Sequence, residues 1–189
     1  MKNILKNRRA LSTVVTTLII LVVSVLLAGV VTYFAINVVS TRVQDESLNL
    51  QYQHVWFSTT DNKAEAAIMI TNTGGRDVVL QNIAVRGQTI PASEVFYFTV
   101  TTIGDLPYYS QANTISTTNT TVPTGFGASG DFKQATTITL TSGSTIAVYM
   151  FAATTAPGSV TVNDVGLTIA ISVFSAQATY IKETNVNAA

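Results

Sequence analysis

The sequence predicts an α+β protein, in which one long N-terminal hydrophobic α-helix is followed by an all-β head, an immunoglobulin-like sandwich. Three observations predict this fold class. An apolar run without a single charge occupies residues 11–41. After residue 48, apolar residues alternate with polar ones, which is the period of a strand with one buried face. Short clusters of Gly, Pro and Ser separate the alternating stretches, and about seven to nine strands joined in this way are typical of a sandwich.

The chain length allows one ordinary domain and an appendage. It has 189 residues, and single domains commonly hold about 100 to 200. We therefore expect three segments: a cytoplasmic leader at 1–10, a hydrophobic helix at 11–48, and an exported β-sandwich head at 49–189.

The charges are unevenly distributed. Ten basic and ten acidic residues balance overall, but the first ten residues hold Lys2, Lys6, Arg8 and Arg9 and no acid, so the remainder has six basic against ten acidic residues. A mildly acidic body lacks the clustered Lys and Arg that bind a polyanion, which excludes nucleic acid as a partner. The chain has no cysteine, which excludes disulfides, thiolate metal sites and cysteine nucleophiles.

The apolar run is long enough to cross a membrane. About 20 helical residues span a hydrocarbon core of roughly 30 Å, and a run of about 30 residues measures roughly 45 Å, so the helix should project beyond the bilayer. Basic residues precede the run, whereas Asp45 and Glu46 follow soon after Arg42. The positive-inside rule therefore places the N-terminus in the cytoplasm and the head outside. A conventional secretory signal has an apolar region of only about 7 to 15 residues.

The junction before the apolar run suggests processing. Arg8, Arg9 and Ala10 abut Leu11 without a spacer. The simplest interpretation is a permanent anchor, but a protease at the cytoplasmic membrane face could cut after Ala10 and leave the whole helix attached. The sequence alone therefore leaves two alternatives, an uncleaved anchor and a cleaved leader.

The segment KNRRALSTVVTTLIIL resembles the class III signal peptide and hydrophobic helix of archaeal type IV pilins and archaellins. The resemblance implies that a prepilin-type leader peptidase cuts between Ala10 and Leu11. It further implies partners of two kinds: a filament assembly platform, and copies of the chain itself in a homopolymer. Bacterial pilins usually have a glutamate five residues into the mature chain, where this sequence has Val15, which favours the archaeal branch.

Small residues recur along the expected helix with spacings of seven, four, four and three. This periodicity places them on one stripe, where they would let helices approach closely in apolar surroundings. Chance is the alternative explanation, because Ser, Thr and Ala are abundant throughout. The candidate helix-packing residues are Thr17, Ser24, Ala28, Thr32 and Ala35.

Two hairpins are expected in the head. One turns at Gly74-Gly75, between alternating stretches at 65–71 and 77–87, and the other turns at residues 142–144. Apolar residues at alternate positions should share a buried face in three strands: Ala66, Ile68 and Ile70; Ile146, Val148 and Met150; and Leu167, Ile169, Ile171 and Val173.

The stretch from about 99 to 130 is rich in Thr, Ser, Asn and Gly, and we expect an exposed loop or edge strand. It contains Asn119-Thr120-Thr121, a candidate N-glycosylation sequon at Asn119. Just before it, Phe96 and Phe98 are expected in the core, which would leave Tyr97 pointing outward. Tyr108 and Tyr109 stay open between core and surface.

No motif points to catalysis, a metal or a cofactor. Residues 125–130 match G-x-G-x-x-G, but Pro123 precedes them and a strand-like segment follows, so a loop is expected rather than a dinucleotide site. His54 is the only histidine, which suits an ordinary strand position better than a metal site or hydrolytic triad. Four acids in expected loops could gather around calcium, although solvated turn acids are the better interpretation: Asp61, Asp105, Asp131 and Asp164.

Together these observations favour a structural subunit over an enzyme. The chain would be a membrane-inserted precursor with a cytoplasmic N-terminus, and its mature form would polymerise through the helix into an extracellular filament for adhesion. Two alternatives remain open: an archaellin, the subunit of a motility filament, and a membrane-anchored extracellular binding module whose helix is never cleaved.

Overall fold

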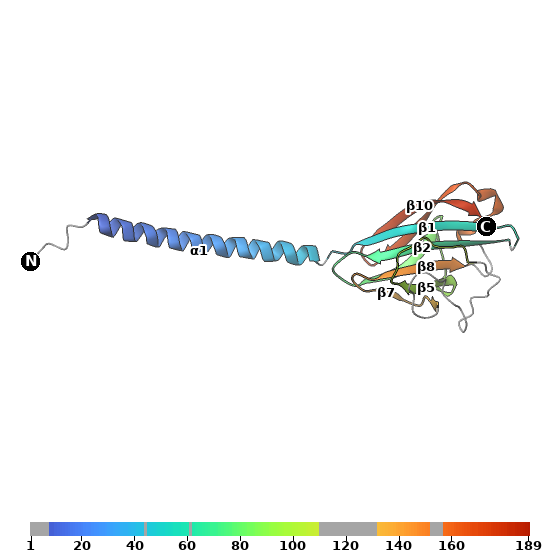
Figure 1. Ribbon diagram of the computed structural model, residues 1–189, viewed down its shortest axis with the longest axis horizontal. Coiled ribbons are helices and arrows are strands. Elements are labelled where there is room, and N and C mark those ends of the chain that lie inside the picture. Colours follow the sequence, from blue (N-terminus) through green and yellow to red (C-terminus); the bar gives the residue numbers. More distant parts are fainter. Residues whose placement is uncertain (1–7, 44, 61, 110–131, 152–156) are drawn as a thin grey trace, which may run out of the picture. The chain divides into compact units, whose positions relative to one another are not determined.

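The computed structural model describes residues 8–43, 45–60, 62–109, 132–151 and 157–189. The chain divides into two compact units, Met1–Val43 and Gln44–Ala189, which are considered separately below. The first unit contains the helix and the second contains the β-rich head (Figure 1).

The helix α1 spans Arg8–Val43, 36 residues. Leu, Val, Ile and Ala dominate it, no proline interrupts it, and Gly29 is its only glycine. It ends five residues before the expected boundary at residue 48 because Leu48 already pairs with Asn72 in the sheet. The segment between α1 and the first strand is therefore only four residues long, 44–47.

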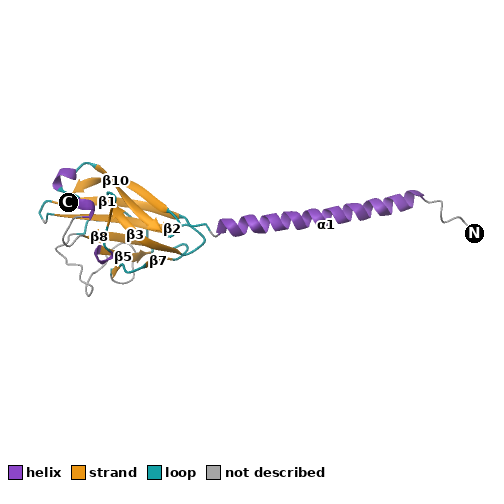
Figure 2. Cartoon of the chain, turned by 180° about the vertical axis from the view of Figure 1, so that it is seen from behind, coloured by secondary structure: helices purple, strands orange, loops and turns teal. Residues whose placement is uncertain are grey.

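The head has ten strands among the described residues, slightly more than expected from the sequence. The strands are β1 Leu48–Ser58, β2 Lys63–Asn72, β3 Val78–Val85, β4 Gln88–Thr89, β5 Val95–Val100, β6 Lys133–Gln134, β7 Ile138–Leu140, β8 Thr145–Phe151, β9 Thr168–Ser175 and β10 Thr179–Ala188. Three short 3₁₀ turns lie between them: η2 Ala92–Glu94, η3 Pro157–Ser159 and η4 Val162–Asp164. Figure 2 shows helices in purple, strands in orange, and loops and turns in teal.

The strands form two layers that are joined along one side. The first layer has the order β1-β2-β8-β5-β6, and the second has β10-β9-β3, with β4 and β7 both pairing with β3. All these pairs are antiparallel, whereas β1 and β10 pair in parallel and connect the layers. In immunoglobulin terms the layers read A-B-E-D and G-F-C-C′, with β6 and β7 added between strands D and E. The strand order confirms the predicted immunoglobulin-like sandwich.

The two hairpins expected from the sequence are wrong. β2 pairs with β1 and β8, while β3 pairs with β9, so the turn at Gly74-Gly75 carries the chain from one layer to the other. The turn at residues 142–144 does the same between β7 and β8. A Cβ at Gly74 would lie only 2.7 Å from the carbonyl oxygen of Asp45, so the glycine permits a close backbone approach rather than a hairpin turn.

The main core lies between the layers. The expected inward residues of β2 and β8 belong to it, as do Ile169, Ile171 and Val173 of β9. Leu167 was expected on the same face, but it precedes β9 and its side chain is 52% exposed. Residue 167 lies in the connection between η4 and β9, so the alternation of β9 does not extend back to it.

A second hydrophobic cluster covers the outer face of the first layer. Phe96 and Phe98 belong to it, which confirms their predicted burial, together with Met69 and Tyr149. Tyr97 was expected to point outward, but it packs against the main core instead. The prediction failed because both faces of the layer are covered beside Tyr97: the neighbouring strand β8 is buried at all seven of its residues.

Candidate assembly helix and head surface

The surface of α1 is apolar on every side. Residues Leu11–Thr41, 31 in number, form a segment long and apolar enough to cross a membrane, and its most apolar stretch of 18 residues has a mean hydropathy of 2.9. Its large aliphatic side chains are exposed, for example Leu21 at 63% and Leu26 at 64%. A helix that is hydrophobic all round belongs in lipid or inside a larger assembly rather than in water.

The predicted stripe of small residues is continuous over only part of the helix. At about 100° per residue, all five predicted residues fall within an arc of about 80°. Leu21 and Val39 fall in the same arc, so small residues dominate it only between Ser24 and Ala35. The opposite arc there carries Leu26, Val30 and Tyr33. This part of the helix therefore has one narrow side and one bulky side.

The hydroxyl groups of the stripe already have partners. Thr17 donates to the carbonyl of Val14 at 2.9 Å, Ser24 to Ile20 at 2.7 Å and Thr32 to Ala28 at 2.7 Å. Such bonds to the preceding turn satisfy a hydroxyl without help from a neighbouring helix. Any attraction between copies at this stripe would accordingly come from close packing of small side chains.

The expected cleavage junction lies in the first turn of α1. The helix begins at Arg8, so Arg8, Arg9 and Ala10 precede Leu11 within one turn, and Leu11 is 70% exposed. The first N–H groups of a helix have no intrahelical partners. This turn can therefore unwind at low cost, as a protease that binds an extended substrate requires.

The head contains a buried acid that the sequence reasoning missed. Glu65 lies on β2 and is 1% exposed, between Trp56 and Phe151 of the flanking strands. The backbone N–H of Tyr109 donates to its Oε1 at 2.8 Å, whereas its Oε2 has no hydrogen-bond partner among the described residues. Burial raises the pKa of Glu65 to about 9, and the Tyr109 bond only partly opposes this. The carboxyl is therefore neutral at pH 7.

Residues 105–109 cross the outer face of the first layer, and we call them the strap. Asp105 Oδ1 lies 2.6 Å from Nε2 of His54, and the hydroxyl of Tyr149 donates to the carbonyl of Pro107 at 3.0 Å. Leu106 is 2% exposed, and Tyr109 bonds to Glu65 as described above. The strap is a loop, as expected from residue 99 onward, but it is not fully exposed, since Leu106 is buried and Tyr108 and Tyr109 are partly buried.

His54 occupies a strand position, as expected from the sequence. It lies on β1, its ring stacks on Trp56 with centroids 5.0 Å apart, and it pairs with Asp105. The ring of Tyr108 contacts Trp56 edge-on at 5.9 Å. His54 on β1, and Tyr108 and Tyr109 in the strap, thus all pack on the outer face of the first layer.

Asp164 is not the solvated turn acid that was expected. Its Oδ2 accepts bonds from the N–H and hydroxyl of Thr161 at 2.8 and 2.9 Å, and its Oδ1 lies 3.0 Å from Arg86. These bonds, led by the Thr161 N–H, lower the pKa of the Asp164 carboxyl. The acid closes a capping box at the start of η4.

The other predicted positions fall outside the described residues. These are the sequon at Asn119, the glycine-rich segment 125–130, Asp61 and Asp131. Within the described ranges, no group of three or more His, Cys, Asp or Glu residues is arranged to hold a metal ion.

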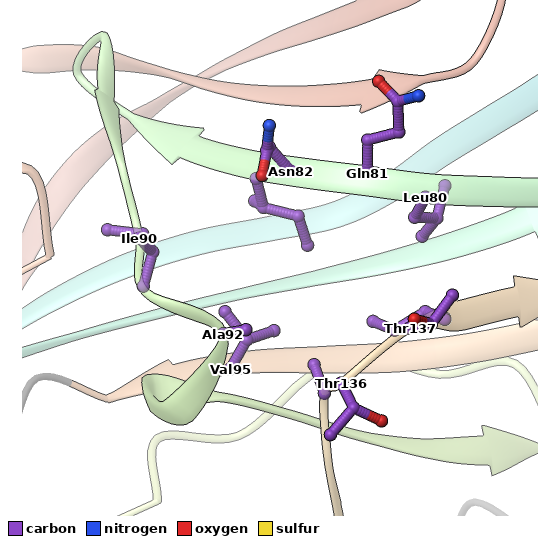
Figure 3. A pocket seen from close by; sticks show the side chains of 11 residues that line it. Leu80, Gln81, Asn82, Ile90, Ala92, Val95, Thr136 and Thr137 are labelled. Carbon is purple, nitrogen blue, oxygen red and sulfur yellow. The ribbon is translucent and has the colours of Figure 1, made fainter.

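A small cavity lies between β3 and β5 (Figure 3). Its volume is about 50 Å³, and its apolar walls include Leu80, Ile90 and Val95. Gln81 and Asn82 lie at a bulge where β3 shifts register against β9, so both side chains are exposed and interrupt the alternation of β3. Sites for small molecules typically enclose about 300 to 1,000 Å³, so this cavity has room for a few water molecules only.

Comparisons with known proteins add no family assignment. The chain matches no protein-family model, and no curated protein shows detectable sequence similarity to it. The function is therefore inferred from the helix, its junction and the head described above.

Proposed function

We propose that this chain is the precursor of a structural subunit of an archaeal type IV pilus-like surface filament. The observation that carries the proposal is α1. Its residues Leu11–Thr41 are uncharged and apolar on every side, and they follow Arg8, Arg9 and Ala10 without a spacer. The subunit polymerises through this helix after a leader peptidase has cut between Ala10 and Leu11.

The physical basis of polymerisation is the surface of the helix. An apolar helix is unstable in water, so its transfer from lipid into a bundle of copies keeps the same surface dry. Removal of the leader takes away four basic residues, Lys2, Lys6, Arg8 and Arg9. These charges would otherwise be drawn into the apolar bundle, where an unpaired charge is costly. A repeated contact between different faces of identical subunits then produces an open fibre.

The narrow and bulky sides of the helix support packing between different faces. From Ser24 to Ala35 the small residues lie opposite Leu26, Val30 and Tyr33. The bulky side of one copy can lie against the narrow side of the next with close contact and without unpaired polar groups, because the stripe hydroxyls bond within their own helix.

Mass spectrometry of surface filaments tests this proposal. Filaments are sheared from cells, purified, and checked by electron microscopy before their subunit is sequenced from the N-terminus. We expect the subunit to begin at Leu11. Replacing Ala10 with Trp should block cleavage and abolish filaments, while the matched leader variant Asn3→Ala should leave both unchanged.

Two outcomes would contradict the proposal. One is a native subunit that begins at Met1. The other is a subunit that stays in the membrane fraction, while cells with the Ala10→Trp chain still attach to surfaces. Either outcome indicates an anchored binding module. Deletion of the gene separates adhesion from motility: we expect loss of surface attachment with swimming intact, and loss of swimming alone identifies an archaellin.

A further inference from the structure

The hydroxyl groups in the middle of α1 bond to the backbone of their own helix, as that of Thr41 also does near the outer end. Thr16, Thr17, Ser24 and Thr32 each donate to a carbonyl of the preceding turn. In hydrocarbon no water is present to satisfy a polar group, so only side chains with partners of their own are well tolerated there. These four hydroxyls are compatible with lipid along the segment from Thr16 to Thr32.

Three other polar side chains lack such partners, and all three lie near the ends of the charge-free run. In the described part of the chain, the side chains of Ser12, Asn37 and Ser40 make no hydrogen bond, and all three are exposed. An amide such as that of Asn37 has donors and an acceptor to satisfy. Water or lipid headgroups can do this, whereas acyl chains cannot.

The aromatic residues of α1 lie between Thr32 and Asn37. Tyr33 and Phe34 are the only aromatic residues of the helix, and they are 71% and 68% exposed. Tyrosine, which has an apolar ring and a polar hydroxyl, concentrates at the boundary between hydrocarbon and water. The segment from Leu11 to Val31 measures roughly 31 Å at 1.5 Å per residue, which matches a hydrocarbon core of roughly 30 Å.

We propose that the helix crosses the bilayer only with residues 11–32. Tyr33 contacts the outer headgroup layer, and the last turns, from Asn37 to Val43, stand in water on the outer side. This assignment rests on the proposed membrane insertion of the precursor. It makes the lipid-facing segment nine residues shorter than the charge-free run of 31 residues.

A steep tilt does not offer an equivalent solution. To place all of Leu11–Thr41 within a core of roughly 30 Å, a helix of roughly 46 Å would have to tilt by about 50°, outside the usual range of about 0 to 40°. It would also bury the unpaired amide of Asn37 in hydrocarbon. The shorter segment avoids both costs.

Single-cysteine labelling of the full-length precursor tests the boundary. The chain has no cysteine, so each variant carries one labelled site without background. The variants are Ser24→Cys, Ala28→Cys, Asn37→Cys and Ser40→Cys, with Ser93→Cys in the head and Lys6→Cys in the leader as controls. Intact cells that lack the leader peptidase are treated with a membrane-impermeant maleimide, and labelling is read as a shift in gel mobility.

We expect Asn37→Cys and Ser40→Cys to be labelled as fully as Ser93→Cys. In contrast, Ser24→Cys and Ala28→Cys should stay unlabelled until detergent is added. Lys6→Cys should react only after the cells are permeabilised. Protection of positions 37 and 40, or labelling of position 28 on intact cells, would overturn the proposed boundary. Extraction of every variant by alkaline carbonate would instead refute membrane insertion itself, so the two failures are distinguishable.

Discussion

Glu65 should make the free energy of unfolding of the head depend on pH, and substitution of this one residue should remove that dependence. Its carboxyl ordinarily has a pKa of 4.5, and burial raises the pKa in the folded head to about 9. Between these values the folded state holds a proton that the unfolded state has lost. Stability therefore falls as the pH rises from about 4.5 to about 9.

The magnitude follows from the two pKa values. Neutral pH lies about 2.5 pH units above 4.5, and each unit corresponds to about 1.36 kcal/mol. The head should thus lose about 3 kcal/mol between pH 4.5 and pH 7 through this one group. A glutamine at this position is neutral at every pH and retains an oxygen that can accept the Tyr109 N–H bond. Glu65→Gln should accordingly abolish this part of the pH dependence.

Urea denaturation of the head, residues 45–189, at a series of pH values provides the measurement. Trp56 is the only tryptophan and is buried beside the strap, so its fluorescence reports unfolding of this region. Glu183→Gln is the matched control, because Glu183 lies exposed on β10 and should leave the pH dependence unchanged. Parallel pH profiles for the wild type and Glu65→Gln would refute the reasoning.

Two further substitutions test the head. Ile171→Ala removes a fully buried side chain and should lower the free energy of unfolding by about 2 to 5 kcal/mol, whereas Ile181→Ala, at a position 58% exposed, should change it by at most about 0.5 kcal/mol in the same urea titration. Equal losses would contradict the assigned core. Asp164→Ala should lower the melting temperature at neutral pH, because the lowered pKa of Asp164 stabilises the folded state above the ordinary value of 3.8. This loss should disappear in strong acid, as followed by circular dichroism, while Asp45→Ala should have little effect at either pH.

Much of the fold could be predicted from local patterns. The absence of charge from Leu11 to Thr41 predicted α1, and alternation predicted the inward residues of β2 and β8. Strand pairing could not be predicted in the same way. Alternation shows which side chains of a strand face the core, but β2 and β3 face the same core from opposite layers. A short turn with glycines is compatible with either a hairpin or a crossing.

The second hydrophobic cluster was missed for a related reason. Its residues come from β1, β2, β5 and β8 and from the strap, which are far apart in the sequence. Glu65 offered one signal, as an acid among the apolar residues of β2. A charged side chain on a strand normally indicates the solvent face, however, and only the position of the strap shows that this face is covered. The predicted helix stripe, in contrast, depended on local geometry alone and could be placed directly.

The parallel pairing of β1 with β10 brings Ala189 to the end of β1 that lies farther from Leu48. Ala188 lies opposite Phe57, and the N–H of Ala189 donates to the carbonyl of Phe57 at 3.1 Å, near the end of β1. The chain enters the head at Leu48, the start of the same strand, about 30 Å away at roughly 3.3 Å per residue. A peptide epitope or fluorescent tag fused after Ala189 would therefore be attached near Phe57, at the end of β1 that is remote from Leu48.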